Sequence, residues 1–186
     1  MTVQAPKRLF TVREFHRMAN GGVFHEDDRV ELLAGEVVEM TPIGARHAGC
    51  VKRLNALLSA PVRAIAVVSV QDPLELDDRS ELQPDLALLK SRSDFYADSH
   101  PRPSDVLLVI EVADTSGEYD RMTKGPLYAR AGIPELWVVD LAARAVDVYK
   151  KPSAGGYQDH RRRVGDDRLS PDLVPALDVR VSQVLG

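Results

Sequence analysis

The stretch VLLVIEVADTSGEYDRMTK, residues 106–124, contains an apolar run that is interrupted by a single acid, Glu111. Residues 106–110 are all Val, Leu or Ile, and Val112 and Ala113 continue the run. This composition predicts a strand that is buried on both faces. Glutamate is depleted in such strands, and burying its charge without a partner costs several kcal/mol. Glu111 must therefore have a compensating partner or a chemical role.

The surrounding pattern predicts a strand–helix–strand unit. A strand over 105–113 precedes a helix over about 118–131, and PELWVVD at 134–140 reads as a second apolar strand. Such a unit favours a parallel strand pair with a right-handed crossover. Pro126 lies inside the expected helix and should kink it, because proline removes a backbone hydrogen bond.

The rest of the chain alternates between hairpins and helices. We expect a first helix over 11–20, opened by the capping-box spacing of Thr11 and Glu14. A second, amphipathic helix is expected to start near 44 and to end before Pro61. The remaining expected elements are a hairpin over 28–40 with its turn at Ala34–Gly35, one or two strands over 64–76 split at Pro73, a polar loop over 77–83, a strand over 84–90 and a hairpin over 144–164.

These elements predict one α/β domain, a mixed β-sheet flanked by α-helices, that spans residues 1–186. Within it we expect a loose N-terminal arm at 1–8, a core at 10–150, and a C-terminal hairpin and edge segment at 151–186. No run is long enough to span a membrane, and the N-terminus lacks the apolar region of a signal peptide. We therefore expect a soluble, cytoplasmic protein. Cys50, the single cysteine, is expected to be a small core residue.

Three carboxylates occupy positions at strands where apolar residues would be expected. Glu31 precedes Leu32–Leu33, Asp85 opens the strand LALL, and Glu111 follows LLVI. If the strands of Asp85 and Glu111 are neighbours, the two acids can converge, and two close carboxylates repel unless a cation or a proton lies between them. Mg²⁺ or Mn²⁺ is the expected cation, because both ions prefer oxygen ligands.

The segment after Glu111 adds a cation and an anion-binding helix end. Asp120 and Lys124 are four residues apart and so share one helix face. Thr115 and Ser116 precede the helix, where hydroxyls cap backbone N–H groups. A lysine near a metal could stabilise charge on a phosphate.

Simpler roles remain open for each of these residues. Asp120 and Lys124 could be an ordinary surface pair, and Glu111 could pair with Arg121. His47, near the start of the second helix, could be a surface or capping residue. The combination of Asp85, Glu111 and Lys124 is what favours a functional site.

That combination resembles the PD-(D/E)xK nuclease superfamily. The motifs RVELLAGEVVEMTPIGARHAG, QPDLALL, LLVIEVADTS followed by YDRMTK, and YARAGIPELWVVD resemble more closely the Uma-two family of restriction endonucleases. The resemblance covers residues 10–150 and implies a restriction-endonuclease-like fold. It implies Asp85 and Glu111 as metal ligands, and Glu31 as a further catalytic residue that is an accessory ligand or binds a second metal ion. In the superfamily pattern a lysine occupies the position of Ala113, and here Lys124 is its substitute. His47, Asp120, Gln83 and Ser116 match accessory positions.

The leading hypothesis is a metal-dependent endonuclease that hydrolyses DNA, with Mg²⁺, or Mn²⁺, held by Asp85, Glu111 and the backbone carbonyl of Val112. A homodimer is expected by analogy with other duplex-cutting nucleases. A second hypothesis is a nuclease-like fold that only binds DNA or assembles, because the net charge of −4 is unusual for a polyanion binder. A third is a metal hydrolase of a small phosphoester.

Overall fold

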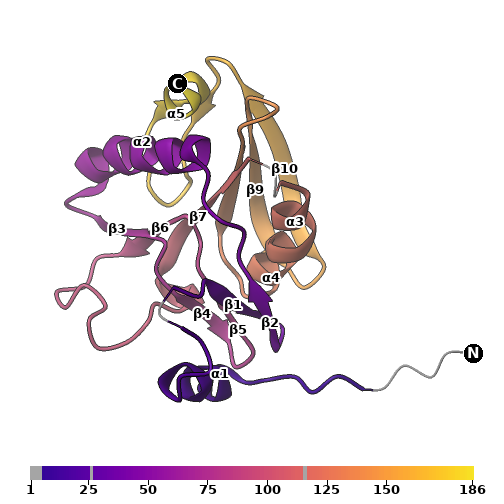
Figure 1. The fold of residues 1–186 in the computed structure, drawn as a ribbon. Helices are drawn as coiled ribbons and strands as arrows, with labels where there is room; N and C mark the ends of the chain where they lie inside the picture. The colour runs from indigo at the N-terminus through magenta and orange to yellow at the C-terminus, as the bar shows by residue number, and fades with distance from the viewer. Residues whose placement is uncertain (1–5, 26, 115–116) are drawn as a thin grey trace, which may run out of the picture.

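The computed structural model describes residues 6–25, 27–114 and 117–186, and its framework is a six-stranded mixed sheet (Figure 1). The strand order is β10-β9-β8-β7-β6-β3. β7 and β8 are parallel, and the other neighbours are antiparallel, which confirms the expected fold class. Its strands are β3 (Ala66–Val70), β6 (Leu86–Lys90), β7 (Val106–Ala113), β8 (Glu135–Asp140), β9 (Ala145–Ser153) and β10 (Gly156–Val164).

β7 lies between two hydrophobic cores, as its apolar sequence predicted. Leu108, Ile110 and Val112 point into the core that lies under α2. Val109 and Ala113 point into the second core, on the opposite face. Because side chains alternate along a strand, Glu111 lies on the same face as Val109 and Ala113.

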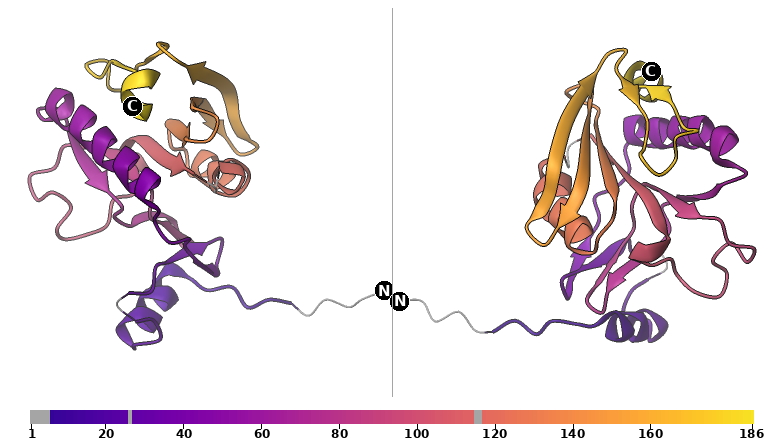
Figure 2. Two further views of the ribbon diagram at one scale, coloured as in Figure 1. Left: turned by 45° about the horizontal axis from the view of Figure 1, so that its top comes forward. Right: turned by 180° about the vertical axis from the view of Figure 1, so that it is seen from behind.

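Helix α2 (Ala45–Val62) covers one face of the large sheet, with α5 (Val181–Leu185) beside it (Figures 1 and 2). Cys50, Leu54 and Leu58 of α2 are buried in its core. The expectation that the helix ends before Pro61 was wrong: Pro61 lies in its last turn. A proline there removes one hydrogen bond at the helix end, and Val62 beyond it is fully buried.

A second, four-stranded sheet has the order β2-β1-β5-β4, and helix α1 (Val12–Asn20) packs against it (Figure 1). The capping box of α1 and the hairpin turn at Ala34–Gly35 are both present, and both turn residues have positive φ. The split at Pro73 is also confirmed, since β3 and β4 belong to different sheets. The strands are β1 (Val30–Leu33), β2 (Glu36–Glu39), β4 (Leu74–Asp77) and β5 (Ser80–Leu82).

The expectation of a polar loop over 77–83 was wrong. This segment contains β5, which lies between β1 and β4 in the sheet. Ser80 and Glu81 are buried, and each has a hydrogen-bond partner: the Ser80 hydroxyl accepts from the Ala34 N–H at 3.3 Å, and Glu81 contacts His16. The polar sequence did not predict this strand, because the hydrogen-bond partners of its buried side chains come from other parts of the chain.

The segment after β7 forms α3 (Gly117–Tyr119), the π-helical turn η2 (Asp120–Lys124) and α4 (Gly125–Arg130). Pro126 therefore lies in the first turn of α4, where a missing N–H costs little. The Gly125 N–H bonds the Asp120 carbonyl, five residues back. The helix irregularity that was expected near Pro126 is thus a π-helical turn that ends at Lys124. Such turns are often found at functional sites.

The C-terminal segment extends the core around α2. The expected hairpin of β9 and β10 is present, with Ser153 and Gly156 at its turn. Beyond it, β11 (Arg168–Leu169) pairs with β12 (Val179–Arg180), and Val181 and Val184 of α5 are fully buried. A short 3-10 helix, η1 (Pro103–Asp105), precedes β7. The core under α2 thus joins residues from Cys50 to Val184.

The expected loose arm falls largely on residues 1–5, outside the described residues. Lys7 and Arg8 pair with Glu36 and Glu14, each at 3.0 Å. Within the described ranges, no helix has both the length and the apolarity that crossing a bilayer requires.

Cys50 is 2% exposed, as its expected core position requires, and burial raises the pKa of its thiol to about 11. Because the thiolate is the reactive form, the folded protein should react very slowly with a thiol reagent at pH 8. In urea, the same thiol should react at the rate of a free cysteine. Absorbance from a disulfide-exchange reagent measures both rates, and rapid labelling without denaturant would contradict the assigned burial.

Candidate active site

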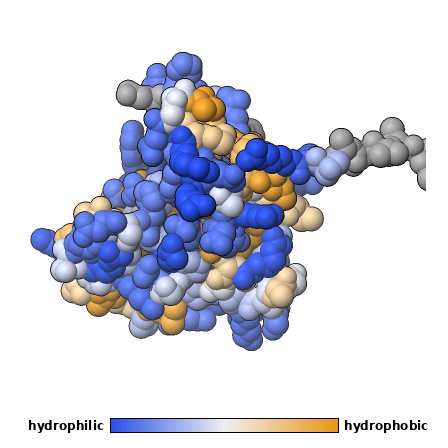
Figure 3. All heavy atoms as spheres, turned by 90° about the horizontal axis from the view of Figure 1, so that it is seen from below, coloured by the Kyte–Doolittle hydropathy of each residue, from blue (hydrophilic) through white to orange (hydrophobic). Residues whose placement is uncertain are grey.

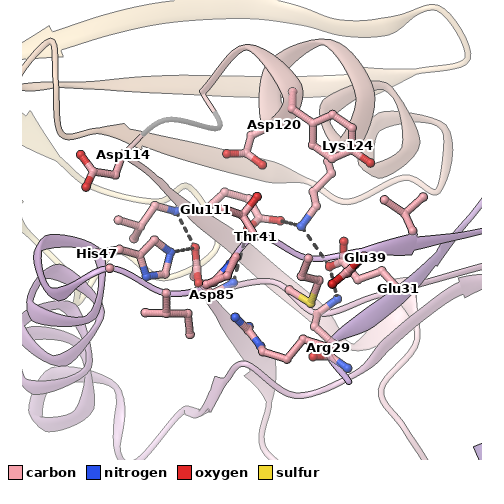
Figure 4. Close-up of a pocket in the computed structure, with 18 residues that line it drawn as sticks. Arg29, Glu31, Glu39, Thr41, His47, Asp85, Glu111, Asp114, Asp120 and Lys124 are labelled. Atoms are coloured by element: carbon pink, nitrogen blue, oxygen red, sulfur yellow. Dashed lines mark hydrogen bonds and ion pairs between the residues drawn. The ribbon is translucent and has the colours of Figure 1, made fainter. Parts of the chain in front are cut away.

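A cavity of about 560 Å³ opens between the two sheets and the helical segment that follows β7 (Figure 4). β1, the N-terminal turn of α2, the start of β6, the end of β7 and the η2 turn all contribute to its wall. Every described residue that was expected to be catalytic, metal-binding or accessory lines it: Glu31, His47, Gln83, Asp85, Glu111, Val112, Asp120 and Lys124.

Asp85 and Glu111 are brought together by the register of β6 and β7. Leu86 lies opposite Ile110, so the residues next to them, Asp85 and Glu111, are neighbours across the strand pair. The Asp85 N–H points at Glu111 Oε2, at 3.4 Å. The convergence expected from the sequence is therefore present, and it depends on these two strands being adjacent.

Asp85 is held by three hydrogen bonds from three parts of the chain. The Val112 N–H donates to Oδ2 at 2.8 Å, and the Gln71 amide donates to Oδ1 at 3.1 Å. His47 Nε2 lies 2.9 Å from Oδ2. The bond to Asp85 raises the pKa of His47 despite its partial burial. His47 Nδ1 is buried and has no hydrogen-bond partner among the described residues.

Glu111 is 3% exposed, and its charge is compensated locally. The Tyr128 hydroxyl donates to Oε1 at 2.6 Å, and Lys124 Nζ lies 3.4 Å from the same oxygen. Burial raises the pKa of Glu111 to about 8, although the charge of Lys124 opposes the rise. The alternative pairing with Arg121 was wrong, because Arg121 bonds Asp140 and Asp147.

Lys124 reaches the same acids from the end of the η2 turn. Its Nζ donates to Glu31 Oε1 at 2.9 Å, and the residue is only 6% exposed (Figure 4). Burial alone would lower the pKa of Lys124, but Glu111 and Glu31 together raise it. Glu31 Oε1 also accepts from the Gln83 N–H at 2.7 Å. Lys124 is thus charged and held by a fixed acid, not a surface lysine.

The remaining accessory residues differ in what the structure shows. Asp120 is 5% exposed and lines the cavity, with its carboxylate directed toward it in Figure 4. Gln83 also lines the cavity, and its backbone holds Glu31. Ser116 and its neighbour Thr115 lie outside the described residues.

Sequence reasoning missed two residues that shape the site. Tyr128 is fully buried and binds Glu111, and its signal was the spacing of one helical turn after Lys124. Gln71 binds Asp85 from a loop position with a φ of 57°, and no sequence pattern pointed to it.

The oxygen-rich wall fits a hard divalent cation. Among the residues that the structure describes, six acids line the cavity, against three cationic or basic groups, Arg29, Lys124 and His47. Asp85 and Glu111 provide adjacent carboxylates, and Mg²⁺ typically takes one or two such ligands together with substrate oxygens. The acids in the cavity wall are Glu31, Glu39, Asp85, Glu111, Asp114 and Asp120.

Comparisons with known proteins identify the fold and the family of this chain. A crystal structure of a "putative nuclease belonging to DUF820" from Anabaena variabilis ATCC 29413 superposes with a TM-score of 0.74 at 15% sequence identity, over 95% of this chain and 97% of that one. At this identity the likeness shows the fold. No curated protein matches the sequence. The Uma2 family model, described as "Putative restriction endonuclease", matches residues 12–182. With nearly its whole length matched, and with the acids and lysine of the motifs gathered in one cavity, this chain belongs to the Uma2 family.

Proposed function

We propose that this protein is a metal-dependent endonuclease that hydrolyses phosphodiester bonds in DNA. One observation carries the proposal: Asp85, Glu111 and Lys124 come from three separate elements and meet in one cavity, where Lys124 Nζ lies 3.4 Å from Glu111. Burying three ionisable groups costs more free energy than packing neutral side chains there, which favours a chemical role for the site. Membership of the Uma2 family supports the same reaction class.

Asp85, Glu111 and the Val112 carbonyl would hold the ion, which we take to be Mg²⁺, with Mn²⁺ as an alternative. When bound, it would polarise a phosphoryl oxygen as a Lewis acid. Asp85 is presented to the cavity by the Val112 N–H and by His47, so its orientation is fixed before any ligand arrives. A site fixed in advance loses less free energy on reorganisation.

Lys124 would bind the scissile phosphate and offset the negative charge that develops on it. Glu31 would act as a positioning residue, because its hydrogen bond to Lys124 and its own bond from the Gln83 N–H fix the ammonium group. Tyr128 would orient Glu111 through the 2.6 Å hydrogen bond from its hydroxyl. These roles extend the sequence prediction, in which Glu31 was an accessory ligand.

Positively charged residues close to the cavity must attract the DNA, because the chain as a whole is acidic. Arg29 lines the cavity, and Arg46 pairs with Asp114 at its wall, 3.0 Å apart. We propose that these two arginines contact the DNA backbone, and that two copies of the chain act on the two strands of a duplex. Pro126 lies in the first turn of α4, and Lys124 before it donates a hydrogen bond to Glu31, which supports a role for Lys124 in the site.

Plasmid nicking tests the proposal. Purified protein should relax supercoiled DNA in Mg²⁺ or Mn²⁺ and not in EDTA, and Glu111→Gln should remove the activity. Asp98→Asn, a change at an exposed acid outside the cavity, is the matched control and should cut like the wild type. Cutting that survives Glu111→Gln would contradict the assigned site. Folded wild-type protein that binds DNA without cutting it would favour the non-catalytic module, and inhibition by nucleotides but not by DNA would favour a small phosphoester.

A further inference from the structure

Two histidines and a glutamate meet on the face of the small sheet that lies away from the candidate active site. They are His16 of α1, Glu81 of β5 and His100 of the loop before η1. One ligand atom from each lies within 4.8 Å of the other two. We propose that these three side chains bind Zn²⁺, at a site separate from the cavity that holds Asp85 and Glu111.

The register of the small sheet separates the two sites. Glu81 lies opposite Leu32, and Leu32 packs against Val12 and Phe15 of α1. Side chains alternate along a strand, so Glu31, the residue before Leu32, faces the other way and lines the cavity. The same sheet thus presents Glu81 to α1 and Glu31 to the candidate active site.

Glu81 is a buried acid that contacts a histidine. It is 5% exposed, and both its carboxylate oxygens lie close to one nitrogen, His16 Nε2, at 3.0 and 2.8 Å. A neutral imidazole can donate one proton but brings no positive charge. Glu81 also lies directly opposite Glu75 on β4, and like charges in that position repel. Arg102 compensates Glu75 at 3.0 Å, whereas a cation between Glu81 and the histidines would compensate Glu81.

His100 is presented by an anchored segment rather than by a free loop end. The Glu75 N–H donates to the Pro101 carbonyl at 3.1 Å, and Pro101 is buried. The residue before a proline is also restricted to extended conformations. The His100 ring lies edge-on to that of His16, with centroids 5.9 Å apart. Both rings are therefore held near Glu81 before any metal arrives, which lowers the entropy cost of binding.

The ligand set selects zinc over magnesium. Two imidazole nitrogens and one carboxylate form a common zinc set, with a fourth position left for solvent. Tetrahedral bonds of about 2.1 Å place ligand atoms roughly 3.4 Å apart, so small side-chain rotations suffice. The His16 side chain is 40% exposed, and His100 is exposed. The face of the molecule seen from below is mostly hydrophilic (Figure 3). Mg²⁺ prefers oxygen ligands and should not compete here.

A bound ion would tie together three segments that are distant in sequence. α1 carries the first ligand, β5 the second and the loop over 91–102 the third. Because the ion binds the folded chain preferentially, Zn²⁺ should raise the melting temperature. The role we assign is structural: the ion fastens α1 to the small sheet, whose other face lines the cavity.

Titration calorimetry with ZnCl₂, after removal of metal by a chelator, tests the proposal. The wild type should bind one Zn²⁺ that His100→Gln weakens at least about tenfold. Because His100 is exposed, this variant should fold normally, and its melting temperature without metal should equal that of the wild type. His25→Gln, at another exposed histidine outside the cluster, is the matched control and should bind like the wild type.

Asp85→Asn separates the two sites. It should leave this Zn²⁺ affinity unchanged, and Co²⁺ used as a probe should give the visible absorption of a four-coordinate site in Asp85→Asn but not in His100→Gln. Zinc binding that is unchanged in both His100→Gln and His16→Gln would overturn the proposal. So would zinc binding that is lost only in Asp85→Asn, or the absence of binding to the wild type at millimolar Zn²⁺.

Discussion

Lys124→Met is expected to abolish DNA cutting and to destabilise the fold by about 3–5 kcal/mol, the typical cost of removing one partner from a buried ion pair. Lys124 is 6% exposed and lies 2.9 Å from Glu31 and 3.4 Å from Glu111, so its loss leaves buried acids uncompensated. Urea denaturation measures the free energy of unfolding, and plasmid nicking below the denaturation range measures activity.

A second substitution separates the structural role of Lys124 from its catalytic role. In the double variant Glu31→Gln, Lys124→Met, the uncompensated charge at residue 31 is gone, while the glutamine oxygen can still accept from the Gln83 N–H. We expect this variant to regain most of the lost stability and to remain unable to cut DNA. If cutting returned with stability, Lys124 would be only a structural cation, and the catalytic assignment would fail.

Asp85→Asn should reduce cutting on the order of 10³-fold, as expected when a preorganised electrostatic group is removed. It should also abolish stabilisation by Mg²⁺ or Mn²⁺. At a metal concentration about ten times the dissociation constant, a single site stabilises the wild type by about 1.4 kcal/mol. For a chain of this size that is about 3–6 °C in melting temperature.

The control for this prediction is Asp114→Asn. Asp114 also lines the cavity, but it pairs with Arg46 and is not part of the proposed ligand set. We expect it to keep the thermal shift. A shift of equal size in Asp85→Asn would show that the ion binds elsewhere. No shift in the wild type at millimolar Mg²⁺ or Mn²⁺ would count against a resident metal.

Local sequence pattern was sufficient for most of the framework. The apolar run at 106–113 and the strand at 134–140 predicted the parallel pair β7 and β8, because only a helical crossover of this length can join them. The capping box of α1 and the Ala34–Gly35 turn were predictable because each is a contact between residues close in sequence. Elements whose stability comes from partners distant in sequence were harder to predict. A loop was expected where β5 lies, and α2 was expected to end before Pro61.

The sequence by itself determined that Asp85 and Glu111 stand at strand positions where an unpaired charge is costly, and that Lys124 follows within the next helix. Only the tertiary structure decided that the three groups meet. The antiparallel register places Asp85 beside Glu111, and the π-turn turns Lys124 toward Glu31. Gln71 and the His16–Glu81–His100 cluster had no local signature. These residues interact because segments distant in sequence lie close together in the fold, and the order of residues along the chain does not show this.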